Sequence, residues 1–333
     1  MTGRGVDETG VAPPIEDPLV AIPLTNCLLS NGHYSALLTA AGSGYSAVDG
    51  IDVTRWREDP TCDCWGQYCY ISDLDTGHVW SAGRQPLGRG ADDYTADLRP
   101  DRATFRRRDG EIETRYEVVV LADVNAEVRR ITLKNRGDQR RALEVTSYAE
   151  VALNARNADQ SHPAFAKLFL ETEYEPANAA LLCRRRPRSR DQKPVWALHF
   201  LVGPGEAAGS ALSDVQFEAD RARFLGRGRS VRNPAALESL ASLSGTAGPV
   251  LDPLFSLRRR VELAPGASAQ LAFVTAMPRD RDEALALSIR LGEMAEVNRV
   301  FDDAETNGKR QFAALELVPG EAAMFQRMAA RES

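Results

Sequence analysis

The sequence is poor in cysteine, histidine and aromatic residues, and each shortage excludes a class of protein. Five of its 333 residues are cysteine, four are histidine, and aromatic residues make up 7%. An odd number of cysteines scattered over so long a chain suits reduced thiols better than a disulfide framework. We therefore expect a reducing compartment. The cysteines are Cys27, Cys62, Cys64, Cys69 and Cys183.

Long apolar runs and an excess of positive charge are also missing. No run of about 18 apolar residues occurs, so no membrane span is predicted, and the polar start "MTGRGVDETGVAPPIEDP" has no signal-peptide core. We expect a cytoplasmic chain that makes no membrane contact of its own. The formal net charge of -6, from 41 basic and 47 acidic residues, argues against nucleic acid as a partner.

Motifs for metals and nucleophiles are equally scarce. Cys62, Cys64 and Cys69 have the spacing C-x-C-x4-C, but a structural zinc site usually needs four ligands and no second ligand pair is present. His33 and His78 stand alone. The stretch "GSGYS" does not match the G-x-S-x-G nucleophile elbow. The sequence therefore predicts no metal, no cofactor and no catalytic residue.

Short strands separated by turns make up most of the chain. "SNG" and "AGSG" supply the positive φ angles of tight turns, and apolar and polar residues alternate on either side of "RDGE", "NRGD" and "APGAS". Each of these three segments is predicted to close an antiparallel hairpin. With more than ten such strands and 43% hydrophobic residues, we expect a mainly β protein, a large antiparallel sandwich.

The hydrophobic period changes from strand to helix at Pro278. Ala284, Leu287 and Leu291 have helical spacing, and a further helix is expected after Pro319-Gly320. Its apolar stripe needs a surface to cover. That stripe consists of Met324, Phe325 and Met328. The predicted organisation is a flexible lead-in over 1–22, a β domain over 23–278 and a helical linker over 279–333.

Charged clusters have an ordinary explanation. The three "RRR" triplets cannot present all their side chains on one face of a strand, so solvated sheet surface and buried ion pairs are expected rather than an anion site. Acid pairs could perform glycoside chemistry if two carboxylates faced one sugar, but pairs arise by chance among 47 acids. The pairs are Glu58/Asp59, Asp73/Asp75, Asp92/Asp93 and Glu171/Glu173.

One short segment gathers aromatic and charged side chains. "RWREDPTCDCWGQYCY" places Trp56, Trp65, Tyr68 and Tyr70 beside two arginines and two acids. A sugar ring needs an apolar face to stack on and hydrogen-bonding partners around it, which such a segment could supply. A core cluster with arginine stacking explains the same pattern. From the residues alone the two interpretations are even.

Several ordered motifs resemble a known family. They include "LLSNGHYSALLTAAGSGYS", "DVTRWREDPTCDCWG", "RRRDGEIETRYEVVV", "EVTSYAEVAL", "HPAFAKLF", "CRRRPRSRD", "DRARFLGRGR" and "VLDPLFSLRRRVEL". Over roughly residues 25 to 315 they resemble the glycosyltransferase family 36 domain of bacterial cyclic β-1,2-glucan synthases, which is also the N-terminal domain of glycoside hydrolase family 94 phosphorylases.

This resemblance implies a galactose-mutarotase-like β-supersandwich followed by linker helices and an (α/α)6 barrel that carries the catalytic acid and the phosphate site. It further implies that the domain aids dimerisation and that loops near the glycine motif approach the barrel. Two departures are visible: Gly42-Ser43-Gly44 stands where a glycine triplet is expected, and Cys62 and Cys64 replace polar residues. The barrel is expected to start where "MFQRMAARES" stands.

Three hypotheses follow. The first is a non-catalytic carbohydrate-binding and scaffold domain that binds a β-glucan or oligosaccharide, adjoins the barrel and aids dimerisation. The second is an autonomous sugar-active enzyme that uses paired carboxylates, and the third is a purely structural dimerisation module. The residues predicted to face carbohydrate or the barrel are Gly42, Gly44, Tyr45, Ser46, Arg55, Trp56, Arg57, Glu58, Asp59 and Trp65.

Overall fold

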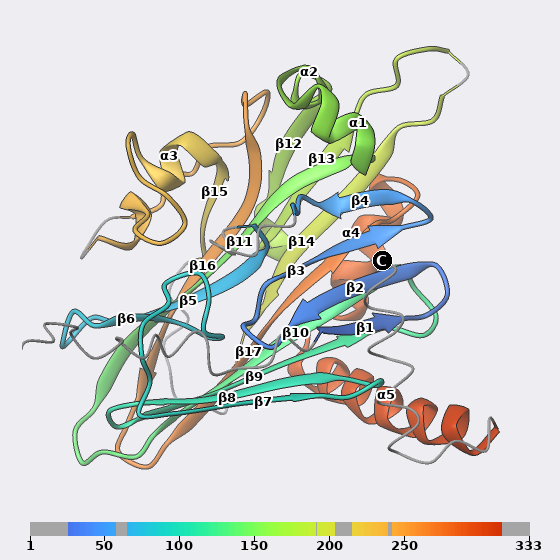
Figure 1. The fold of residues 1–333 in the computed structure, drawn as a ribbon. Helices are drawn as coiled ribbons and strands as arrows, with labels where there is room; N and C mark the ends of the chain where they lie inside the picture. The colour runs from blue at the N-terminus through green and yellow to red at the C-terminus, as the bar shows by residue number, and fades with distance from the viewer. Residues whose placement is uncertain (1–25, 58–64, 191, 204–214, 239–241, 315–333) are drawn as a thin grey trace, which may run out of the picture.

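Two antiparallel sheets packed face to face form the body of the molecule (Figure 1). The computed structural model describes residues 26–57, 65–190, 192–203, 215–238 and 242–314. The predicted lead-in, Glu58, Asp59, Cys62, Cys64 and the stripe around Phe325 lie outside these ranges. The mainly β class predicted from alternation is confirmed.

The first sheet has nine strands. Seven of them follow the order β1(Asn26–Ser30), β2(Tyr34–Thr39), β3(Gly44–Val48), β4(Ile51–Thr54), β11(Arg141–Ala155), β16(Pro253–Leu263) and β15(Gln216–Asp220). The other two, β5(Gln67–Asp73) and β6(Val79–Ser81), extend from β11, which is long enough to pair with β4, β5 and β16. The fifteen-residue β11 therefore joins both parts of this sheet.

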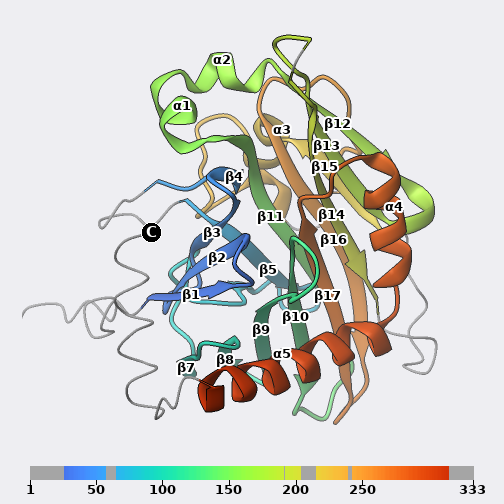
Figure 2. The same cartoon turned by 90° about the vertical axis from the view of Figure 1, so that its right-hand side faces the viewer.

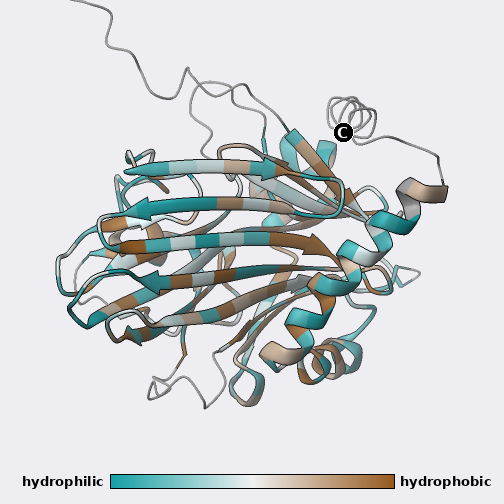
Figure 3. Cartoon of the chain, turned by 90° about the horizontal axis from the view of Figure 1, so that it is seen from below, coloured by the Kyte–Doolittle hydropathy of each residue, from teal (hydrophilic) through white to brown (hydrophobic). Residues whose placement is uncertain are grey.

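The second sheet has eight strands. Their order is β12(Leu170–Glu175), β13(Ala180–Arg185), β14(Val195–Val202), β17(Ser268–Ala276), β10(Ala126–Asn135), β9(Ile112–Val120), β8(Ala103–Asp109) and β7(Asp93–Leu98). The main core lies between the two sheets, where Tyr34, Trp80, Phe105 and Phe255 are fully buried. Hydrophobic and hydrophilic residues alternate along the strands (Figure 3), as period-two side-chain placement requires.

Helices cover the outer faces of the sheets. The predicted change to helix is confirmed by α4(Arg281–Arg290) and α5(Met294–Ala314), whose Leu287, Val297 and Phe301 pack on the outer face of the eight-stranded sheet (Figure 2). The predicted domain limits themselves stay a prediction. None of the described helices combines the length and apolar character that crossing a membrane requires.

Three short helices were missed by the hydrophobic pattern. They are α1(Arg156–Ser161), α2(Pro163–Lys167) and α3(Arg221–Leu225), and two 3-10 turns, η1(Pro176–Asn178) and η3(Ala235–Leu237), accompany them. A helix of five or six residues has too few turns to show an apolar period. Around α3, Phe224 and Val231 form a second core with Tyr70 and Tyr148 on the outer face of the nine-stranded sheet.

Two of the three predicted hairpins were wrong. "RDGE" does close the β8–β9 hairpin, with Gly110 at φ 56°. "NRGD" instead links β10 of one sheet to β11 of the other, and "APGAS" links β16 to β17 in the same way. The two links lie side by side, because Asn135 donates from Nδ2 to the carbonyls of Gln139, Leu263 and Ala264.

The first arginine triplet follows the predicted alternation. On β8, Arg106 and Arg108 are exposed whereas Arg107 is buried and pairs with Asp109, Nε to Oδ2 at 2.6 Å. On β16, Arg260 is exposed while Arg258 and Arg259 are buried. Solvated surface and buried ion pairs thus explain the first triplet, whereas Arg259 does not fit that explanation.

Acid will destabilise the core through His199. This imidazole is stacked between Phe255 and Phe273, and it hydrogen-bonds Ser147 and Thr275. Burial, then the charge of Arg129, lowers the pKa of His199 from 6.5 to about 3. Because the unfolded chain takes up a proton below pH 6.5 and the folded chain does not, stability is complete at neutral pH and falls as the pH drops.

From pH 7.5 to pH 5, His199 alone is expected to lower the free energy of unfolding by about 2 kcal/mol. Denaturant unfolding at both pH values measures this change, and His199→Gln should flatten it. His78→Gln is the control, because this exposed side chain should leave the wild-type pH dependence in place. If the free energy of unfolding changed equally with pH in wild type and His199→Gln, the expectation would be contradicted.

Candidate functional site

Tyr45 and Trp56 meet where β3 packs against the segment after β4. The rings of Tyr45 and Trp56 stack with centroids 5.3 Å apart at 29°, and the guanidinium of Arg156 lies over Tyr45 at 4.1 Å. Tyr45 is buried and Trp56 is partly exposed. Trp56 therefore forms the accessible part of this stack.

Gly42 and Gly44 let backbone segments approach closely. At Gly44, with φ 151°, an added Cβ would lie 1.9 Å from the carbonyl oxygen of Leu37. At Gly42, with φ 86°, it would lie 3.1 Å from Cα of Gly83. Both positions require glycine for steric and conformational reasons. The glycine motif is thus explained by packing of the backbone.

The same turn fixes the position of Trp65. Gly44 forms an isolated bridge with Gly66, and Ser43 donates from Oγ to the carbonyl of Trp65 at 2.6 Å. The guanidinium of Arg57 lies 4.9 Å from the centre of the Trp65 ring. Arg57 and Trp65 are both partly exposed. We call these two residues and Trp56, the neighbour of Arg57 in the chain, the tryptophan surface.

Ser46 points to the opposite side of the sheet. Its hydroxyl donates to Oε2 of Glu127 on β10 at 2.8 Å and accepts from Nε2 of Gln67 at 2.7 Å. Glu127 in turn pairs with Arg129, and all four side chains are buried between the sheets. Alternation along β3 places Tyr45 outside and Ser46 inside. Ser46 thus joins the two sheets and cannot contact a sugar directly.

Arg55 is the centre of a buried ion-pair network. Its side chain is only 2% exposed, and Nε lies 2.8 Å from Oδ2 of Asp159 while Nη1 lies 3.2 Å from Oε2 of Glu150. Its backbone N–H also donates to the carbonyl of Glu150 at 2.8 Å. A guanidinium with carboxylates on two edges satisfies the geometry that makes buried pairs strong.

The network continues to α2 and α3 through Asp252. Arg221 lies 2.6 Å from Glu150 and 3.5 Å from Asp252, and Lys167 lies 2.6 Å from Asp252. We call these side chains, together with Asp159, the Arg55 network. It binds α1, α2 and α3 to the end of β4 and to the middle of β11.

Electrostatics keeps Glu150 ionised. Burial alone would raise the pKa of Glu150, but the charges of Arg221 and Arg55 and a hydrogen bond from Tyr148 outweigh it and lower the pKa below 4.5. Glu150 therefore holds no proton at neutral pH. A general acid needs the opposite, a raised pKa, so Glu150 does not fit that role.

The acid pairs weighed for catalysis are also engaged, so far as the structure describes them. Asp73 accepts from the backbone of Asp75, and Asp92 accepts from Gly110. Glu171 pairs with Arg184 and Arg186, and Glu173 pairs with Arg281. Within the described ranges no three metal-ligating side chains come together. These carboxylates therefore hold turns and strands in place.

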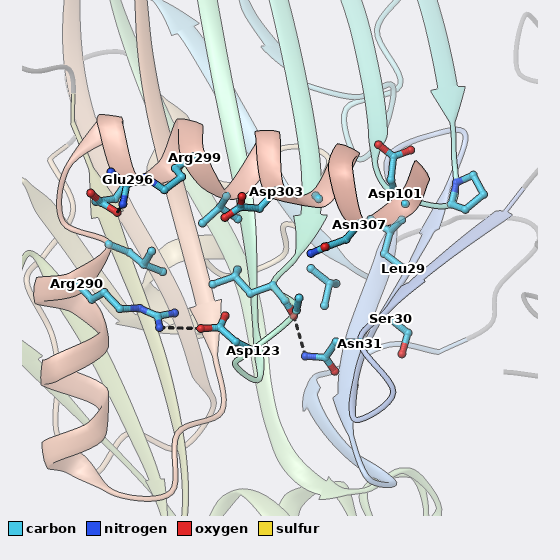
Figure 4. A pocket seen from close by; sticks show the side chains of 18 residues that line it. Leu29, Ser30, Asn31, Asp101, Asp123, Arg290, Glu296, Arg299, Asp303 and Asn307 are labelled. Atoms are coloured by element: carbon cyan, nitrogen blue, oxygen red, sulfur yellow. Dashed lines mark hydrogen bonds and ion pairs between the residues drawn. The ribbon is translucent and has the colours of Figure 1, made fainter. Parts of the chain in front are cut away.

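None of the predicted site residues that the structure describes lines the groove below α5 (Figure 4). It has a volume of about 640 Å³ and lies between α5, the β1–β2 turn and the β9–β10 turn. Two of its arginines are paired, Arg290 with Asp123 and Arg299 with Glu296. Each of these cations therefore already has a carboxylate partner within the chain.

Sequence comparison assigns this architecture to a family. The model of the glycosyl hydrolase 94 supersandwich domain matches residues 14–293. The chain belongs to this family. The antiparallel supersandwich implied by the ordered motifs is thereby confirmed, together with the resemblance itself.

Named relatives of this supersandwich domain are much longer. It is 37% identical over 312 residues to the cyclic beta-(1,2)-glucan synthase NdvB of Rhizobium meliloti (strain 1021), covering 94% of the chain and 11% of that protein. It is 24% identical over 279 residues to the N,N'-diacetylchitobiose phosphorylase of Vibrio proteolyticus, covering 81% and 33%. The chain thus spans a third or less of these two relatives.

A solved structure agrees on the fold alone. The supersandwich domain matches a bacterial glucoamylase complexed with acarbose with a TM-score of 0.50 and 8% identity, over 86% of this chain and 38% of the other. At 8% identity, this similarity shows only that the two chains share a fold.

Sequence reasoning found Arg55 but missed its partners. Glu150, Asp159, Arg221 and Asp252 are far apart in the chain, and no local spacing connects them. A signal was present, because four further quoted motifs each contain one member of the Arg55 network: "EVTSYAEVAL", "HPAFAKLF", "DRARFLGRGR" and "VLDPLFSLRRRVEL". Motifs of one family that contain complementary charges point to a shared contact.

Proposed function

We propose that this supersandwich domain is a non-catalytic carbohydrate-binding and scaffold domain of a cyclic β-1,2-glucan synthase-like protein, and that it binds glucan chains through the tryptophan surface. The observation that supports the proposal is the pair of partly exposed indoles, Trp56 and Trp65, beside the guanidinium of Arg57. Flat apolar rings next to planar hydrogen-bond donors are what a sugar ring requires.

The base of this surface supports the proposal further. Arg55 is anchored to Glu150 and Asp159, and Trp56 is stacked on Tyr45, so the accessible side chains follow a rigid backbone. A binding site built on fixed elements loses little conformational entropy when a ligand binds. The Arg55 network thus acts indirectly, as a positioning device.

The proposal extends to partners and compartment. We propose that the domain lies beside an (α/α)6 barrel in a longer protein and that it also aids dimerisation. We propose no catalytic activity for the domain itself. The proposal also places the chain in the cytoplasm. In support, Cys27, Cys69 and Cys183 are free and buried, and burial raises the pKa of each thiol. Such thiols suit a reducing compartment.

Removing the indole of Trp65 should weaken glucan binding by about two- to tenfold, because an aromatic stacking contact contributes about 0.5 to 1.5 kcal/mol. Fluorescence polarisation of a labelled β-1,2-linked glucose oligomer measures the affinity of Trp65→Ala. The matched control is Trp196→Ala, because Trp196 is also partly exposed beside an arginine but lies on β14 of the other sheet.

The two variants separate binding from structure. Lost affinity in Trp65→Ala with an unchanged melting temperature, and unchanged affinity in Trp196→Ala, would support the tryptophan surface. A lower melting temperature with unchanged affinity would show that Trp65 belongs to the core, as a structural module requires.

A further inference from the structure

A second groove contains Arg259, a buried arginine that pairs with no side chain in the described ranges. It has a volume of about 700 Å³ and lies between the end of β14, the end of α4 and the start of α5. Arg259 lines it, is only 8% exposed, and makes no hydrogen bond or ion pair with any part of the chain that the structure describes. Burial lowers the pKa of this guanidinium, with no carboxylate to oppose the change.

The strand pattern explains how the charge comes to lie there. Leu257 and Val261, two residues to either side on β16, belong to the core between the sheets, so alternation directs Arg259 toward the same interior. Its guanidinium extends to Gly203, where an added Cβ would lie 1.6 Å from Nη1. The absence of a side chain at Gly203 therefore leaves the space that the guanidinium occupies.

A second source of positive potential lines the same groove. The 21-residue helix α5 begins at Met294, and Met294 and Ala295 both face the groove. The first backbone N–H groups of a helix have no intrahelical partner, and the helix dipole adds partial positive charge at that end. Such an N-terminus binds oxyanions readily.

The groove walls are otherwise apolar or neutral, apart from one carboxylate. Phe200, Leu201 and Ile289 line it, and Ile289 is 69% exposed. Glu293 lines it as well, and its exposed side chain stands just before α5. In contrast to the groove below α5, where both arginines are paired, this groove offers an uncompensated cation.

We propose that this groove binds an oxyanion, held between the guanidinium of Arg259 and the N-terminus of α5. An unpaired buried cation costs stability, and a bound oxyanion removes that cost by supplying the missing charge and hydrogen-bond acceptors. The site lies at the junction of the second sheet with the helices, so it is distinct from the tryptophan surface and does not depend on the proposed glucan binding.

Calorimetric titration of the full chain with inorganic phosphate, and separately with acetate, tests the site and tells a phosphate group from a carboxylate. Wild type should bind at least one of these ions saturably. Arg259→Gln should weaken that binding about tenfold or more. Gly203→Ala, which keeps the charge but displaces the guanidinium, should weaken it too, whereas Glu293→Gln should tighten it by removing a repelling carboxylate.

Arg260→Gln is the matched control, because this neighbour on β16 is exposed and lies 3.6 Å from Glu262. The affinity of Arg260→Gln for phosphate or acetate should equal that of wild type. Arg259→Gln should also melt at the wild-type temperature or higher in chloride, since an unpaired cation has been removed. No saturable binding by wild type, or equal affinity in Arg259→Gln and Arg260→Gln, would overturn the proposal. If Arg259→Gln does not fold, unchanged affinity in both Gly203→Ala and Glu293→Gln would overturn it.

Discussion

Replacing Arg55 by methionine is expected to lower the free energy of unfolding by about 3 to 5 kcal/mol. The guanidinium is buried and lies within hydrogen-bond distance of Glu150 and Asp159. Without it, Asp159 loses its bidentate partner and both carboxylates remain in a site that excludes water. Unpaired buried charge is among the strongest destabilising changes a single substitution can produce.

Denaturant unfolding followed by circular dichroism measures this loss. Arg108→Met is the control, since this exposed arginine on β8 should contribute less than about 0.5 kcal/mol. Adding Asp159→Asn to Arg55→Met should recover part of the stability, because it removes one of the stranded charges. A loss below about 1 kcal/mol in Arg55→Met would contradict the Arg55 network as a stabilising element.

Replacing Gly44 by alanine is expected to cost at least about 3 kcal/mol. The new Cβ would lie 1.9 Å from the carbonyl oxygen of Leu37 and 2.9 Å from its carbonyl carbon. Both are backbone atoms of the paired strand β2, so relief requires the β2–β3 ladder to separate, and the φ of 151° adds strain for any L side chain.

Gly90→Ala provides the comparison for Gly44→Ala. A Cβ at Gly90 would meet no atom within 4 Å, and its φ lies outside the region that favours glycine. Thermal unfolding should therefore show a large fall in melting temperature for Gly44→Ala and almost none for Gly90→Ala. Equal melting temperatures would mean that the close approach of β2 and β3 is not required.

Local signals predicted the strands, several turns and the change from strand to helix after Pro278. Gly32, Gly42 and Gly110 sit at positive φ where the turns were expected. The hairpin predictions at "NRGD" and "APGAS" were wrong. Alternation and turn residues indicate that the chain reverses, but they do not indicate to which sheet the next strand belongs. That choice depends on pairing between β10 and β17 and between β11 and β16, more than a hundred residues apart.

The sequence predicted which residues belong to the candidate site, but it did not predict what each side chain does there. Gly44, Ser46 and Arg55 were expected to face a ligand, whereas the structure has them buried in packing and hydrogen bonds. Trp56 and Trp65 are partly exposed, but the surroundings of Trp56 include Tyr45 and, over that ring, Arg156 of α1, which is distant in sequence. Residue type and spacing do not encode which side of a strand becomes the outside.

Isothermal titration calorimetry of the intact chain with β-1,2-linked glucose oligomers tests the proposed function most directly, because one trace distinguishes binding from turnover. A saturable isotherm, with the heat flow returning to baseline after each injection in phosphate buffer, is the predicted result. The absence of any binding heat would contradict carbohydrate recognition by this domain. A sustained heat flow that scales with chain concentration would contradict its non-catalytic role.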